Sequence, residues 1–225
     1  MSRFLFFLLK LLFTPLLGLL GYCMIKSSFK TFGMCNPDFY NSVLMHPYFL
    51  AYVSAIVLRI CIGVLYKGKV SNPLNFVDTM EHELTHSLFG YLTFSPPLSL
   101  LATLESGGEV KLKRKNVFIV LSPYFFPLWG SIALVTGLII KEPFQPFWNI
   151  ASFILLGNFC YRICLEFRWH QTDLTIYGRF FSLCFIFCLW LSTHISLLYI
   201  IKITDYTWFM ETGSCMWTII RRIFF

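Results

Sequence analysis

Two histidines and a glutamate form a pattern that can bind a metal ion and activate water: His82, Glu83 and His86 make up the sequence His-Glu-x-x-His. On an α-helix, residues four positions apart lie on the same face, with about 5–6 Å between their Cβ atoms. Two imidazoles at this spacing can bind one zinc ion through Zn–N bonds of about 2.0–2.1 Å. Glu83 can accept a proton from metal-bound water and later deliver it to a leaving amine. The pattern therefore predicts a hydrolytic zinc site.

The segment around this motif is predicted to be a helix. It contains no proline from Phe76 to Phe89, and it has an amphipathic spacing of apolar residues: Phe76, Met80, Leu84 and Leu88. Ionisable groups this close to apolar segments are costly unless they are paired, metal-bound or hydrated. A polar helix facing water is the alternative interpretation, and we favour a metal site on this helix.

A catalytic zinc ion usually has a third protein ligand and keeps a fourth position for water. Asp173 is our first choice, because it lies at the boundary of an apolar run, on the same predicted side of the membrane as the motif. Glu166 and His170 are the alternatives. The other residues with suitable side chains are less favoured: His46, Glu105, Glu109 and His194.

The composition is that of a membrane protein. Apolar residues make up 57% of the 225 residues and charged residues 13%, against roughly 45–50% and about 25% in ordinary soluble domains. The mean hydropathy is +0.69, and a soluble fold would have to expose large apolar patches. We therefore expect an all-α polytopic membrane protein that forms a single domain over 1–225.

About five to six transmembrane helices are expected, since a helix needs about 20 apolar residues to span a bilayer. The apolar runs are Phe4–Ile25, Val43–Tyr66, Val117–Ile140, Phe147–Phe167 and Thr175–Ile201. We interpret the first as a retained helix rather than a signal peptide, because Lys10 interrupts it. Two proline sites should interrupt helices: Pro96-Pro97 after the motif segment, and Pro123 with Pro127 early in the third run.

The net charge of +7 does not indicate nucleic-acid binding, because basic residues flank apolar runs, as they do on the cytoplasmic side of membranes. Three such groups are Lys67 with Lys69, Lys111 to Lys115, and Arg162 with Arg168. The eight cysteines are scattered and predict no disulfide framework.

A short strand is predicted from Glu105 to Lys113. It begins with a Gly-Gly turn signal at Gly107 and Gly108 and continues with alternating polar and apolar residues. A strand beside a membrane must pair its backbone groups, so we expect a membrane-associated strand or hairpin here.

From roughly Asn72 to Ile201, the sequence resembles the site-2 protease family of intramembrane zinc metallopeptidases, in a compact form. The resemblance rests on the His-Glu-x-x-His motif, the later Asp173 and the sequence Gly107-Gly108-Glu109-Val110. It implies zinc bound by His82, His86 and Asp173, with Glu83 as the catalytic base. The aspartate stands in Gln-Thr-Asp-Leu, whereas the family has Asn-Pro-Asp-Gly or Leu-Asp-Gly.

The resemblance also implies substrate-binding residues and partners. The strand with Gly107, Gly108 and Val110 would hold an unwound transmembrane or membrane-associated polypeptide by β-addition. Asn158 lies within an apolar run, where an amide usually bonds another helix, and it is a candidate for holding the substrate backbone. We expect a multi-pass protein in contact with lipid, in a bacterial inner membrane, with its active site toward the cytoplasm.

Two other functions remain open. One is a membrane zinc protease whose third ligand is a glutamate, in which case Glu166 would take the role of Asp173. The other is a non-enzymatic zinc-binding membrane protein. The intact Glu83 argues against this second reading, because a purely structural site needs no base. With five histidines, the chain lacks the ligands of a di-iron oxygenase.

Overall fold

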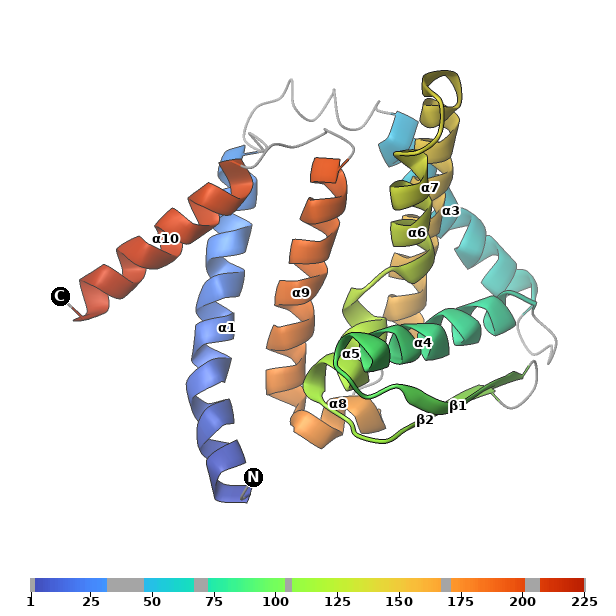
Figure 1. The fold of residues 1–225 in the computed structure, drawn as a ribbon. Coiled ribbons are helices and arrows are strands. Elements are labelled where there is room, and N and C mark those ends of the chain that lie inside the picture. The colour runs from blue at the N-terminus through green and yellow to red at the C-terminus, as the bar shows by residue number, and fades with distance from the viewer. Residues whose placement is uncertain are drawn as a thin grey trace. The chain divides into compact units, whose positions relative to one another are not determined.

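The computed structural model describes residues 3–31, 47–66, 73–103, 107–166, 171–200 and 207–224. The chain divides into two compact units, which we describe separately. The first unit comprises Met1–His46 and Leu174–Phe225, and the second comprises Pro47–Asp173. Figure 1 shows the helices and strands of both.

The second unit contains most of the elements. They are α3 (Pro47–Leu65), α4 (Pro73–Leu92), β1 (Pro97–Thr103), β2 (Gly107–Leu112), α5 (Val117–Phe125), α6 (Leu128–Gly137), the short 3-10 helix η1 (Glu142–Phe144) and α7 (Gln145–Glu166). The unit also includes the first residues of α8 (Thr172–Tyr177).

Helix α7 packs against both α3 and α6. Small residues allow these close approaches, as is common between membrane helices. A Cβ at Gly157 would lie 2.4 Å from the backbone oxygen of Tyr52, and a Cβ at Gly130 would lie 2.7 Å from Cδ2 of Leu156.

The predicted helix around the motif is confirmed as α4, and the predicted strand as β2. Helix α4 ends before Pro96-Pro97, and the N–H of Ser95 donates to the backbone oxygen of Gly90 at 2.8 Å. β2 pairs antiparallel with β1 in a two-stranded sheet, with Ala102 opposite Gly108. The hairpin packs on α4, so it lies beside the motif helix.

The predicted interruption early in the third apolar run is also confirmed. Helices α5 and α6 meet at a bend of 73°. Pro127 lies at the break and has no backbone N–H to continue the helix. The run that we expected as a kinked span is therefore a bent helix pair.

The described residues of the first unit form three long helices together with most of α8. Helix α1 (Arg3–Thr31) packs against α9 (Arg179–Ile200) and α10 (Thr207–Phe224). Met24 of α1 and Cys188 and Ile195 of α9 form a small buried core. Phe187 of α9 packs against α1 at Gly21, where a Cβ would lie 3.4 Å from the ring, an ordinary contact distance.

Within the described ranges, three helices are long and apolar enough to cross a membrane: Pro47–Leu65, Gln145–Leu165 and Arg179–Leu197. The bent pair α5–α6 would make a fourth if it forms one span. A mostly helical chain with such helices and one small sheet is compatible with a membrane protein. The count of five to six spans stays a prediction.

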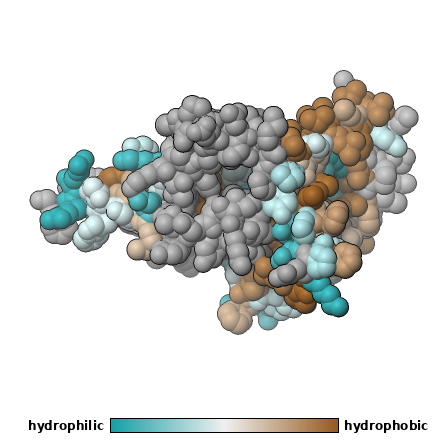
Figure 2. Space-filling view, turned by 90° about the horizontal axis from the view of Figure 1, so that it is seen from above, coloured by the Kyte–Doolittle hydropathy of each residue, from teal (hydrophilic) through white to brown (hydrophobic). Residues whose placement is uncertain are grey.

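Apolar side chains cover much of the outside of the second unit. Helix α3 buries only Ala55 and Arg59, and its exposed residues include Leu50, Val57, Leu58, Val64 and Leu65. Figure 2 shows apolar side chains gathered over the region where α6 ends and α7 begins. An exposed apolar surface of this kind suits lipid rather than water.

Candidate metal centre

Helix α4 places the two histidines of the motif next to each other. Its sequence from Leu74 to Phe89 contains neither proline nor glycine, so nothing interrupts the helical spacing. The ring centroids of His82 and His86 are 4.8 Å apart. The i,i+4 geometry predicted from the motif is present.

Asp173 joins this pair. In the described part of the chain, His82, His86 and Asp173 each offer one ligand atom, and these atoms all lie within 4.8 Å of one another. The ligands of a tetrahedral zinc ion lie about 3.3 Å apart at bond lengths of about 2 Å, so small side-chain rotations would bring the three groups to bonding distance. Two imidazoles and a carboxylate are a donor set that suits zinc and similar divalent metals.

His86 is held in one orientation by the backbone of α5. Its Nδ1 lies 2.7 Å from the carbonyl oxygen of Ile119. A carbonyl can only accept, so Nδ1 carries the proton and Nε2 keeps the lone pair that a metal needs. Burial, and secondly the neighbouring His82, lower the pKa of His86 to about 3. The imidazole is therefore neutral near pH 7.

Tyr124 connects the other two ligands. Its hydroxyl donates to Oδ2 of Asp173 at 3.1 Å, and its ring meets that of His82 edge-on, with 5.7 Å between centroids. Tyr124 is fully buried, which limits its movement. With Oδ2 bonded to the hydroxyl, the other oxygen of Asp173 can serve as a ligand. Nothing in the local sequence around Tyr124 indicates this contact with a residue 49 positions later.

Glu83 lies against the hairpin. It is buried, and a Cβ on Gly108 would lie 2.4 Å from its Cγ and 2.8 Å from its Oε1. Gly108 thus lets the backbone of β2 approach the expected base directly. The strand and the motif, which the sequence analysis joined only by resemblance, are in contact.

Of the remaining predicted residues, Gly107 and Val110 lie on β2 and Asn158 lies on α7. Gly107 begins β2 with a φ of +84°, a conformation that favours glycine. Val110 is half-buried and pairs with Leu100. Asn158 is half-buried on α7, and among the described residues we find no hydrogen bond from it to the metal-binding group. His170 and the side chain of Glu166 lie outside the described residues.

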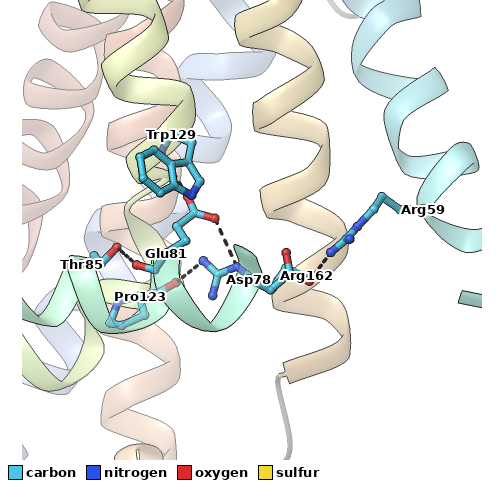
Figure 3. A network of polar contacts seen from close by, with 7 residues as sticks. All are labelled: Arg59, Asp78, Glu81, Thr85, Pro123, Trp129 and Arg162. Atoms are coloured by element: carbon cyan, nitrogen blue, oxygen red, sulfur yellow. Dashed lines mark hydrogen bonds and ion pairs between the residues drawn. The ribbon is translucent and has the colours of Figure 1, made fainter. Parts of the chain in front are cut away.

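Two ion pairs with buried arginines join α4 to neighbouring helices (Figure 3). Arg59 of α3 pairs with Asp78, and Arg162 of α7 pairs with Glu81, with 3.5 Å between Nε and Oε2. Arg162 flanks the end of an apolar run in the sequence. In the structure it is 2% exposed and pairs with a carboxylate inside the second unit.

We compared the chain with models of known protein families, with curated proteins and with solved structures, and none matched it.

Proposed function

We propose that this protein is a zinc-dependent metalloprotease that hydrolyses peptide bonds within or beside a membrane. The observation that carries the proposal is a group of three possible metal ligands. The ligand atoms of His82 and His86 on α4 and of Asp173 on α8 all lie within 4.8 Å of one another. Glu83 is the neighbour of the first histidine and is not needed for a purely structural metal site.

Each residue has a defined task in this reaction. His82, His86 and Asp173 would hold the zinc ion, which when bound acts as a Lewis acid and lowers the pKa of a coordinated water. The hydrogen bond to Ile119 keeps His86 in the metal-binding tautomer. Tyr124 holds Asp173 in place.

Glu83 transfers a proton from the attacking water to the leaving group. Its carboxylate takes a proton from the attacking water as the oxygen adds to the peptide carbonyl carbon, and it passes that proton to the leaving nitrogen as the C–N bond breaks. The products are a carboxylic acid and an amine, so water is the only co-reactant.

Strand β2 is the proposed docking element for the substrate. A transmembrane helix has its carbonyls engaged in hydrogen bonds and must unwind before cleavage. An extended segment could then pair with a strand, and β2 passes Glu83 at Gly108. The substrate would be a transmembrane or membrane-associated polypeptide, and the enzyme would be a multi-pass protein with its site toward the cytoplasm.

The test uses a single-span reporter protein, with a helix-destabilising Asn-Pro pair in its span, incubated with the detergent-purified protein. We expect cleavage by the wild type, loss of cleavage with 1,10-phenanthroline, and no cleavage by Glu83→Gln although this variant retains its metal. Cleavage that persists in the Glu83→Gln variant would contradict the proposed mechanism.

A further inference from the structure

The break between α5 and α6 leaves two backbone groups without their usual partners. The carbonyl of Pro123 would normally accept from the N–H four residues later, but that residue is Pro127. Trp129 is the second residue of α6, so its N–H belongs to the first turn and has no acceptor within the helix. Both groups lie inside the second unit, where an unsatisfied polar group is costly.

One ion pair satisfies both groups. Arg162 donates from its Nη2 to the carbonyl oxygen of Pro123 at 3.3 Å, and Glu81 accepts from the backbone N–H of Trp129 at 3.2 Å. Figure 3 shows the guanidinium of Arg162 between Glu81 and Pro123. The charges also suit the helix dipoles, with the carboxylate at the start of α6 and the guanidinium at the end of α5.

This pair lies next to the elements that carry the candidate metal ligands. Glu81 precedes His82, and Pro123 precedes Tyr124, whose hydroxyl donates to Asp173. Thr85, one residue before His86, donates to the backbone oxygen of Glu81 at 2.7 Å. The ion pair therefore holds α4 and α5 together at the level of the proposed ligands.

We propose that Glu81 and Arg162 are positioning residues of the metal centre: their ion pair caps the broken helix and fixes Tyr124 against His82 and Asp173. This inference rests on the proposed function, since it assumes that the three ligands bind a metal. It assigns a role to two buried charges that neither the ligand set nor the catalytic base uses.

A matched control is available on the same helix. Asp78 lies three residues before Glu81 and pairs with Arg59, whose guanidinium also lies 5.4 Å from the ring centroid of Tyr161. The Arg59–Asp78 pair likewise joins a buried arginine to a carboxylate, here a half-buried one, and it connects α4 to α3 rather than to α5 and α6. Its loss should affect the fold to a similar degree without moving Tyr124.

The experiment measures Co²⁺ binding to the full-length protein in detergent, by titration and by the visible absorption spectrum. The double variant Glu81→Gln/Arg162→Met removes both charges, so that no unpaired charge stays buried. We expect it to lose about tenfold or more in Co²⁺ affinity, as is typical for residues that support metal ligands, and to change the Co²⁺ spectrum. The control Asp78→Asn/Arg59→Met should stay close to wild type in both readouts. Circular dichroism verifies that each variant is folded.

The outcomes separate this inference from the proposed function. A folded Glu81→Gln/Arg162→Met variant with wild-type affinity and spectrum would overturn the positioning role, while Co²⁺ binding by the wild type would still support the metal site. A wild type that binds no Co²⁺ would overturn both. If the double variant does not fold, Arg162→Lys replaces it: lysine keeps the charge beside Glu81 but lacks the fork that reaches Pro123 as well. An unchanged spectrum in folded Arg162→Lys would then overturn the role.

Discussion

At the residue scale, the candidate centre depends on hydrogen bonds that orient the ligands. His86 is bonded to Ile119 and Asp173 to Tyr124, and each of these partners restricts the rotation of its ligand. Such partners limit the entropy that is lost when a metal binds, and their removal typically lowers metal affinity by about 10- to 100-fold.

Tyr124→Phe tests this arrangement directly. The variant keeps the buried ring and removes only the hydroxyl that donates to Asp173. We expect the thermal stability to change little and the zinc affinity to fall by about tenfold, as measured by competition with a chromophoric chelator. Tyr91→Phe, at an exposed position of α4, is the control. Equal zinc affinities for wild type and Tyr124→Phe would show that the hydroxyl does not support Asp173.

Gly108→Ala tests the contact between the strand and the base. The new Cβ would lie 2.4 Å from Cγ of Glu83, so the carboxylate must move. We expect proteolysis of the reporter to fall about tenfold or more, because misplaced catalytic groups lose rate steeply, while the zinc content stays unchanged.

The control for this variant is Gly213→Ala on α10, at an exposed position where a Cβ meets nothing within 4 Å. If Gly108→Ala cleaves as fast as wild type, Glu83 does not act from its position beside β2.

The local part of this site could be predicted from the sequence, and the rest could not. His82 and His86 are four residues apart on one helix, so secondary structure alone brings them together. Tyr124 and Arg162 reach the site through tertiary contacts across 49 and 81 residues, with Asp173 and Glu81 respectively. No periodicity encodes such contacts. The position of Arg162 near the end of an apolar run gives no sign of its buried partner Glu81.

At the element scale, prolines and glycines in the sequence predicted where elements end but not how they pack. Pro127 predicted the interruption of the third apolar run but not the 73° bend or the packing of α5 on α4 and of α6 on α7. The strand β2 was predicted from its alternation, whereas its partner β1 was not, because β1 is apolar at most positions and resembles part of a span.

Ser95 joins the hairpin to the end of α4, and its loss should loosen the hairpin. Its Oγ donates to the backbone oxygen of Arg114 at 2.8 Å and accepts from the N–H of the same residue at 2.9 Å. Removing a buried hydroxyl that makes such bonds costs about 1–3 kcal/mol. We expect Ser95→Ala to speed amide exchange in β1 and β2 but not in α4, as measured by hydrogen–deuterium exchange. The exposed Ser99→Ala should have no effect, and equal exchange in both variants would contradict this role.

At the scale of the whole molecule, long apolar helices and exposed apolar side chains are compatible with a membrane protein. Helix α3 is 19 residues long and only 11% of it is buried, so its outer face needs an apolar environment. Its one arginine, Arg59, is buried against Asp78. A charge in a lipid-facing helix is tolerated when it turns inward and is paired.

Spin labels can test whether this face contacts lipid. Leu58 is 60% exposed on α3, whereas Lys113 is an exposed residue after β2. The native cysteines are replaced, and each labelled protein is placed in bilayers. We expect oxygen, which enters the lipid, to relax a label at position 58 more than a water-soluble nickel complex does. A label at position 113 should show the reverse. Greater access of the nickel complex at position 58 would contradict a lipid-facing α3.

The most direct test of the account is the zinc content of the detergent-purified protein, for wild type, His86→Ala and Asp173→Ala side by side. We predict about one zinc ion per chain in the wild type, as for a three-ligand catalytic site, and loss of zinc in both variants. Loss in His86→Ala alone would contradict Asp173 as the third ligand. A wild type that holds no zinc, even after reconstitution, would contradict the metal centre itself.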